Sequence, residues 1–351
     1  MMDAQNFLKP SRRELVRSLA SAVTLLPACA LLAQTKKKAG NSANHRRVDV
    51  HHHMLPPFIE LWKGRNWSPE VSLETMDKFG TETAILSVTG LQPSFADLFY
   101  DGTEKSRAFV RKMNDFGAKT VSDHSKRFGL FACLPLPDQD AVHKEIEYAF
   151  DTLKADGVML FSNTGDKWPG DPLFRPMFEE LNRRKAIVFI HPSIPKCCRN
   201  FVPGVGDTTV EFDFDTTRSI TSMLFNGVFA DFPDVRVIVN HSGAAVPVLS
   251  GRIKDQVRGD RGKVIPGGSA GAFEELRKLY FECAHASYPA PMAALQKFAP
   301  PTQFLFGTDY PVWPYDTTIN PLNETEPELS REVQHMLDRG NAERLFPRLK
   351  S

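Results

Sequence analysis

The sequence predicts a (β/α)8 barrel of the TIM type, because short apolar runs alternate with amphipathic segments along most of the chain. Eight runs rich in β-branched and aromatic residues read as buried strands, at 48–52, 83–89, 128–134, 157–161, 187–191, 235–241, 279–283 and 304–308. Amphipathic, helix-like stretches lie between several of them, at 105–124, 140–154, 172–184 and 216–231. This alternation is typical of a parallel barrel wrapped by helices. An open doubly wound sheet is the alternative, although the Gly-rich phosphate turn that such sheets often use is absent from the sequence.

The composition is that of a globular protein with a bulky core. The chain has 351 residues, of which 42% are hydrophobic, and it contains 26 Phe. The formal net charge of +1 gives no electrostatic reason to expect nucleic-acid binding, which needs a clustered basic surface. No repeat of fixed period is visible, so a solenoid is not expected.

Residues 1–34 have the order of an export signal. Arg12 and Arg13 precede an apolar stretch at 19–33, and adjacent arginines resemble a twin-arginine signal. This stretch is too short and too interrupted by proline for a stable membrane span. We therefore expect a cleaved signal and a periplasmic location, with an uncleaved tail on a cytoplasmic protein as the alternative.

Two further features belong to this N-terminal region. The sequence from Leu26 to Cys29 weakly resembles a lipoprotein box, so a lipid anchor is a second alternative, although the proline at position 27 fits it badly. Residues 35–45 are predicted to form a polar linker. The barrel domain is predicted to occupy residues 46–351.

The first predicted strand carries the start of a metal site. Alternate side chains of a strand share a face, so Asp49, His51 and His53 are expected to point one way and His52 the other. Neutral imidazole is a good ligand for a divalent transition metal, and a zinc-like shell needs about two more ligands from distant strands. The alternative is that these adjacent histidines lie in a surface loop.

Three later strands end in residues of the same kind. His191 closes the fifth run, His241 the sixth, and Asp309 follows the eighth. In a barrel these ends meet at the rim where the chemistry takes place, so all three should converge with the histidines of the first strand. Taken singly, each histidine could be a hydrogen-bonded rim residue and Asp309 a turn cap.

These segments resemble the amidohydrolase superfamily. The resemblance rests on Asp49 to Pro57, Phe189 to Pro192, Asn240 to Gly243 with Gly251 to Ile253, and Leu305 to Pro311. More narrowly, they are similar to the branch of aminocarboxymuconate-semialdehyde decarboxylase and the ortho-hydroxybenzoate decarboxylases. The stretches 128–138 and 214–218 are similar to 6-methylsalicylate decarboxylases, and the likeness covers about residues 46–349.

The resemblance implies one divalent metal, usually zinc with manganese as the alternative. Its ligands would be three histidines and one aspartate, and the remaining histidine would be the general acid/base that moves the proton. The ligands are His51, His53, His191 and Asp309, and the acid/base is His241. Members with two metals usually bridge them with a lysine or glutamate at the end of the fourth strand, and 157–163 offers neither.

Three more residues have an implied or open role. Several decarboxylases of this branch use a carboxylate, commonly glutamate, as a metal ligand at the position of Asp49, which could instead orient a histidine. In the same branch an arginine at the position of Arg252 reaches a neighbouring subunit's active site and pairs with the substrate carboxylate; the alternative is a solvated helix charge. Arg218 is a second candidate partner for that carboxylate, or else a helix-surface ion pair.

The resemblance leads to a metal-dependent, non-oxidative decarboxylase of a small aromatic or unsaturated carboxylic acid, such as a hydroxybenzoate. One alternative is a metal-dependent hydrolase of a lactone, ester or amide, which would use the same ligands. A second alternative is an exported metal- or ligand-binding protein without catalysis. We expect a small-molecule carboxylate as substrate and a homodimer or higher homo-oligomer.

Overall fold

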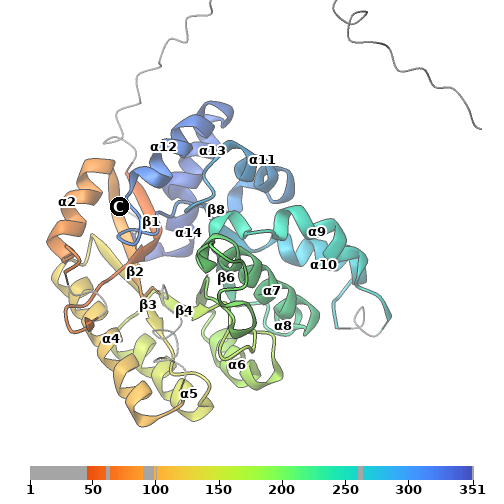
Figure 1. Ribbon diagram of the computed structural model, residues 1–351, viewed down its shortest axis with the longest axis horizontal. Helices are drawn as coiled ribbons and strands as arrows, with labels where there is room; N and C mark the ends of the chain where they lie inside the picture. Colours follow the sequence, from red (N-terminus) through yellow and green to blue (C-terminus); the bar gives the residue numbers. More distant parts are fainter. Residues whose placement is uncertain (1–45, 61–63, 90–98, 100, 260–263, 350–351) are drawn as a thin grey trace, which may run out of the picture. The chain divides into compact units, whose positions relative to one another are not determined.

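The predicted barrel is confirmed. The computed structural model describes residues 46–60, 64–89, 99, 101–259 and 264–349. Eight parallel strands follow one another around the sheet in chain order, and helices surround them (Figure 1). The strands are β1 (Arg47–His53), β2 (Thr81–Ser87), β3 (Phe128–Cys133), β4 (Gly157–Phe161), β5 (Ile187–His191), β6 (Arg236–Val239), β7 (Tyr280–Glu282) and β8 (Phe304–Leu305). The predicted export signal at 1–34 and linker at 35–45 lie outside the described residues.

The barrel closes between β8 and β1. The amide of Val50 donates to the carbonyl of Phe306 at 3.0 Å, and farther along the amide of His53 donates to the carbonyl of Tyr310 at 2.7 Å. Between them the amide of Asp309 donates to the carbonyl of His51 at 2.7 Å. The end of the eighth strand is therefore hydrogen-bonded directly to the strand that carries the paired histidines.

Polar residues cap the amino ends of several helices. Ser68, Thr103 and Asp138 each accept a backbone amide at the start of a helix, which satisfies a donor that has no partner inside the helix. No described helix has both the length and the apolarity needed to cross a membrane. The helices are α2 (Pro69–Phe79), α4 (Glu104–Asp123), α5 (Gln139–Glu147), α6 (Arg175–Arg183), α7 (Glu211–Phe225), α8 (Val228–Asp231), α9 (Val246–Asp255), α10 (Gly268–Arg277), α11 (Pro289–Phe298), α12 (Asp316–Thr325), α13 (Arg331–His335) and α14 (Asn341–Leu345).

The predicted helix at 216–231 differs from the observed structure. It begins five residues earlier, at Glu211, and it is divided into α7 and α8. Gly227 causes the division, because its φ of 74° lies in the left-handed region, which a right-handed helix cannot contain. The earlier start of α7 brings Asp213 and Asp215 into its first turns.

Large apolar side chains fill the barrel. Phenylalanine side chains from several strands are fully buried, among them Phe128, Phe131, Phe161, Phe189 and Phe281. Burying each one stabilises the fold by roughly 1.5–3 kcal/mol. This packed interior gives the polar residues at the strand ends a rigid base.

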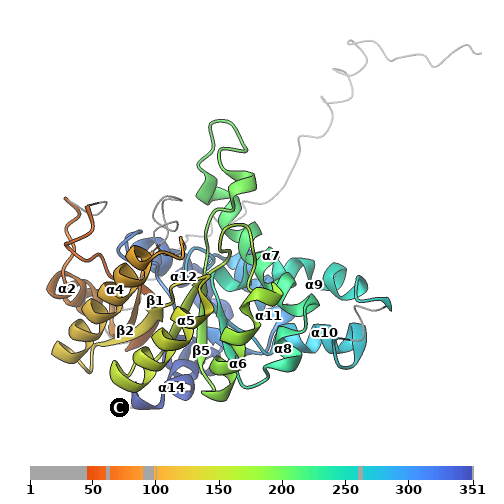
Figure 2. The same cartoon turned by 90° about the horizontal axis from the view of Figure 1, so that it is seen from below.

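The segment from β5 to α7, residues 192–210, projects beyond the helices at one end (Figure 2).

Candidate metal centre and active site

The structure brings four of the predicted residues together at the carboxyl ends of β1 and β5 and just after β8. His51, His53, His191 and Asp309 are buried, and one ligand atom of each lies within 4.8 Å of the others. The Nε2 atom of His53 is 3.1 Å from that of His51, 3.2 Å from that of His191 and 2.7 Å from Oδ1 of Asp309. We refer to these four residues as the four-donor cluster.

Hydrogen bonds on the far side of each ring determine which nitrogen faces the cluster. Nδ1 of His51 donates to Oε1 of Glu282 at 2.8 Å, and Nδ1 of His191 donates to the carbonyl of Pro192 at 2.8 Å. Nδ1 of His53 contacts the hydroxyl of Ser87 at 3.0 Å. That hydroxyl donates to the carbonyl of His52, so it accepts from the ring. In this tautomer all three rings direct an Nε2 lone pair inward, and one cation could accept all three.

The charges around the cluster also favour a cation. Burial lowers the pKa of His51, but the Glu282 and Asp309 carboxylates outweigh burial and raise this pKa to about 10. Burial raises the pKa of the Asp309 carboxyl, yet His51 and His285 hold it well below its usual range. Without a metal the site therefore attracts a proton to His51. The donor set of three imidazoles and one carboxylate fits a divalent metal in its place.

Asp49 lies on the other side of β1, so the prediction that it shares a face with His51 and His53 is wrong. The pairing of β1 with β2 has a register shift between Asp49 and His52, which reverses the alternation of side chains. Oδ2 of Asp49 accepts from Nδ1 of His52 at 3.0 Å and from the hydroxyls of Thr308 and Tyr315. Its other oxygen accepts the backbone amides of His51 and Thr308. Asp49 thus braces the backbone of β1 and β8 rather than joining the cluster.

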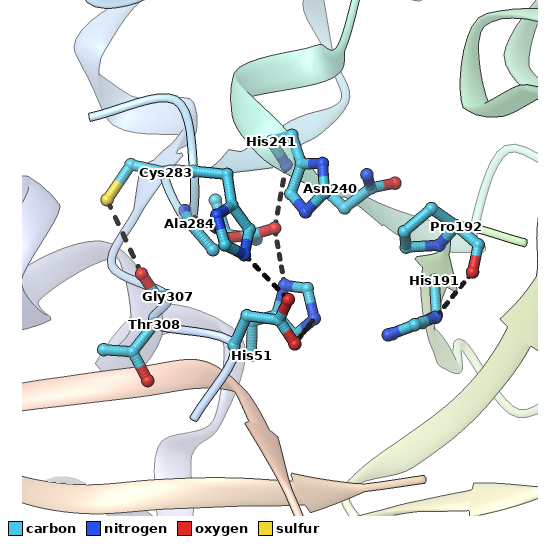
Figure 3. A network of polar contacts seen from close by, with 12 residues as sticks. His51, His191, Pro192, Asn240, His241, Cys283, Ala284, Gly307 and Thr308 are labelled. Atoms are coloured by element: carbon cyan, nitrogen blue, oxygen red, sulfur yellow. Dashed lines mark hydrogen bonds and ion pairs between the residues drawn. The ribbon is translucent and has the colours of Figure 1, made fainter. Parts of the chain in front are cut away.

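His241 lies next to the four-donor cluster without belonging to it. Its ring is stacked on that of His51 with centroids 5.8 Å apart, and its Nδ1 is 2.7 Å from Oδ1 of Asp213 on α7. Its Nε2 is buried and has no hydrogen-bond partner among the described residues. Burial lowers the pKa of His241, but the Asp213 carboxylate outweighs this effect and raises it. The rings of His51, His191 and His241 face a shared space (Figure 3).

Sequence reasoning missed three residues of this site. Glu282, at the end of β7, accepts from His51 Nδ1 and from the backbone amide of His241, each at 2.8 Å. His285 donates through Nε2 to Oδ2 of Asp309 at 2.8 Å, and Asp213 holds His241. A carboxylate inside the apolar run 279–283 was the signal for Glu282. No pattern marked His285 or Asp213, whose contacts depend on tertiary packing.

The two predicted arginines lie outside the cluster. Arg252 is exposed on α9 and makes no hydrogen bond or ion pair with the residues that the structure describes. Arg218, on α7, forms ion pairs with Glu211 at 3.4 Å and Asp215 at 3.8 Å. Within this single chain, neither guanidinium is brought to the four-donor cluster.

The backbone at this rim adopts an uncommon conformation. Three residues after β6 and one each after β7 and β8 have left-handed φ angles between 52° and 60° although none of them is glycine. They are His241, Ser242, Ala244, His285 and Asp309. A non-glycine residue in this region costs roughly 1–2 kcal/mol, so the surrounding packing must enforce these turns.

The matching family model decides the relationship of the chain to known proteins. It is described as Amidohydrolase and matches residues 48–348. The chain belongs to this family. The predicted resemblance is therefore confirmed at the level of the family, and individual relatives bear out its narrower part.

Several curated relatives are decarboxylases. A 6-methylsalicylic acid decarboxylase of Penicillium expansum is 33% identical over 323 residues, which cover 87% of this chain and 97% of the relative. Decarboxylase yanB of Aspergillus niger is 32% identical and covers 87% of this chain and 88% of the relative. The relationship to decarboxylases thus extends over nearly the whole barrel.

Solved structures confirm the fold. A 5-carboxyvanillate decarboxylase from Novosphingobium aromaticivorans, complexed with manganese and a nitrobenzoic acid derivative, matches with a TM-score of 0.75 and 17% identity. The match covers 88% of this chain and 97% of that one. At this identity the likeness supports the architecture alone, and it shows that a member of this fold holds manganese.

Proposed function

We propose that the protein is a metal-dependent, non-oxidative decarboxylase of a small aromatic carboxylic acid, such as a hydroxybenzoate. One observation carries this proposal: His241 lies beside the four-donor cluster, with Asp213 on one ring nitrogen and no partner on the other. A protein that only bound a metal or a ligand would need no such group. The decarboxylases among the relatives support the reaction class.

We infer that the four-donor cluster holds one divalent metal. The manganese in related solved structures supports manganese, whereas three imidazoles and one carboxylate would also suit zinc. When bound, the metal would supply positive charge that stabilises negative charge on the substrate oxygens. Glu282, Ser87 and the Pro192 carbonyl would keep the three rings oriented.

His241 would supply the proton for the reaction. When the carboxylate leaves as carbon dioxide, the bond between it and the ring carbon breaks, and that carbon must receive one proton. The unpartnered Nε2 is the atom that would deliver this proton, while Nδ1 stays hydrogen-bonded to Asp213. The carboxylate of Asp213 would hold the ring in position, and a proton from water would restore His241.

The remaining substrate contacts would come from outside the cluster. We infer that Arg252, exposed and unpaired among the described residues, serves the active site of a neighbouring subunit in a homodimer or larger oligomer. Arg218 is a second candidate for the substrate carboxylate once its ion pairs with Glu211 and Asp215 loosen. Export to the periplasm stays a prediction of the N-terminal sequence.

The test is a substrate panel on protein of known metal content. Purified protein is depleted of metal, reloaded with manganese or zinc, and incubated with 6-methylsalicylate, 2,6-dihydroxybenzoate, lactones and amides. We expect one metal per chain by elemental analysis and release of carbon dioxide from at least one aromatic acid. Ring opening of a lactone without carbon dioxide would assign a hydrolase instead, and no turnover of any substrate would leave only binding.

A further inference from the structure

The first turns of α7 contact the segment that presents His241. Thr216 donates through its hydroxyl to Oδ1 of Asn240 at 2.9 Å, and the hydroxyl of Thr217 accepts the amide of Ala245 at 3.1 Å. Asn240 and Ala245 lie on either side of the left-handed turn that carries His241. α7 therefore holds the backbone on both sides of this imidazole, in addition to holding its ring through Asp213.

One buried carboxylate attaches this part of α7 to another strand end. The side chain of Asp215 is fully buried. It accepts from the hydroxyl of Ser162 at 2.5 Å, the amide of Asn163 at 2.7 Å and the indole of Trp168 at 2.8 Å. Ser162 and Asn163 directly follow β4, so Asp215 links α7 to the rim of a strand that contributes nothing to the four-donor cluster.

The chemistry of this link requires a group that only accepts hydrogen bonds. An ionised carboxylate can only accept, so the hydroxyl of Ser162 donates to Asp215 while Ser162 Oγ accepts the backbone amide of Ser193 at 2.9 Å. Three donors thus converge on one side chain, with two of them on the same oxygen. An ionised carboxylate accepts all three hydrogen bonds. An asparagine amide of the same shape would place its NH2 group opposite at least one of the three donors, which would then have no acceptor.

We propose that Asp215 is a positioning residue for His241: it anchors α7 to the rim after β4, and α7 in turn holds Asp213 against the imidazole. Asp213 and Asp215 are two residues apart in the same helical turn, so the anchor and the contact move as one unit. Proton delivery tolerates displacements of only about 0.5 Å. The proposal rests on the proposed role of His241 as the proton donor.

The kinetic test is a double-mutant cycle. Asp215→Asn should lower kcat by about 10- to 100-fold, the loss expected for a misplacement of up to about 1 Å, and should change KM little. Asp213→Asn should cost at least as much. In the double variant the two losses should not multiply, because both act through the same ring.

Ser219→Ala is the matched control. Ser219 is buried on the same helix, and its hydroxyl has no hydrogen-bond partner among the described residues. The control should retain wild-type kcat and thermal stability. Losses from Asp213→Asn and Asp215→Asn that multiply, or a fall in metal content of Asp215→Asn, would overturn the proposal, because Asp215 would then act by another route.

A second readout does not need turnover. The Nδ1 proton of His241, identified in a ¹⁵N-histidine spectrum by its disappearance in His241→Ala, should shift or broaden in Asp215→Asn and stay unchanged in Ser219→Ala. An unchanged signal in Asp215→Asn would overturn the proposal even if every substrate failed. A shifted signal without turnover in the wild type would refute only the decarboxylase assignment.

If Asp215→Asn does not fold, Trp168→Phe replaces it in both measurements. This variant keeps an aromatic ring and removes one of the three donors. We expect a smaller fall in kcat and a smaller shift of the same proton. An unchanged kcat and signal in folded Trp168→Phe would overturn the proposal.

Discussion

Replacement of Glu282 should weaken both metal binding and folding, and comparison with a second buried carboxylate should separate the two effects. Glu282 is fully buried and accepts three donors: Nδ1 of His51 at 2.8 Å and the amides of His241 at 2.8 Å and Ala284 at 2.6 Å. In Glu282→Gln the single amide oxygen cannot serve donors on both sides. At least one N–H would face the new NH2 group without an acceptor.

Two magnitudes follow from this geometry. Loss of a carboxylate that orients a ligating histidine typically lowers metal affinity by about 10- to 100-fold, which is roughly 1.4–2.7 kcal/mol. A buried donor without a partner costs about 1–3 kcal/mol of folding free energy. For a domain of about 300 residues each kcal/mol lowers Tm by roughly 1.5–2 °C.

The assay combines competition with a metal chelator and calorimetry of the metal-free protein. Glu180→Gln is the matched control. Glu180 is also buried, but it pairs with Arg183 and Arg184 at the carboxyl end of α6, before the amino end of β5. The control should lose stability and keep wild-type metal affinity. The expected fall in metal affinity is at least about tenfold. A metal affinity of Glu282→Gln within about twofold of the wild-type value would refute the orienting role of Glu282.

Three further results are expected. His241→Ala should lower kcat by about 10²- to 10⁴-fold while elemental analysis shows unchanged metal content; metal loss would place His241 among the ligands. Gly307→Ala should lower Tm and metal content together, because a Cβ would overlap Glu282 and press on His51 at 2.9 Å. The Arg183 and Arg184 partners lower the pKa of Glu180 from 4.5 to about 2, so its stabilisation, complete above pH 4.5, is lost as pH falls toward 2. Urea titrations should show a shallower loss for Glu180→Gln; an equal loss would contradict this reasoning.

Hydrophobic pattern was sufficient to predict the barrel and the residues of the four-donor cluster at its strand ends, together with His241. Buried parallel strands are continuous apolar runs, so a polar residue that ends one is conspicuous, as His191 is at the end of β5. Alternation failed at Asp49, because the extra residue in β1 leaves no mark in the sequence. A bulge is decided by pairing with the neighbouring strand, which no local pattern contains.

The residues that surround the cluster were harder to predict. Asp213 lies on α7 among other polar residues and looks like part of a solvated helix face. Its contact with His241 depends on where α7 begins and on the left-handed turn after β6. Asp215 directly precedes the predicted helix at 216–231, and its three donors come from a segment about fifty residues earlier in the chain. Such long-range contacts depend on packing geometry rather than on residue type.

The left-handed turns after β6, β7 and β8 bear on any attempt to make this protein more heat-resistant. Glycine in place of Ser242 or Ala244 would relieve the backbone strain of these positive φ angles, and relief of strain favours the folded state. In this protein the relaxed turn after β6 would also allow the imidazole of His241 to move relative to the four-donor cluster. Stabilising substitutions should therefore be placed at the amino ends of the strands. Substitutions at the rim that raise the melting temperature should also lower kcat.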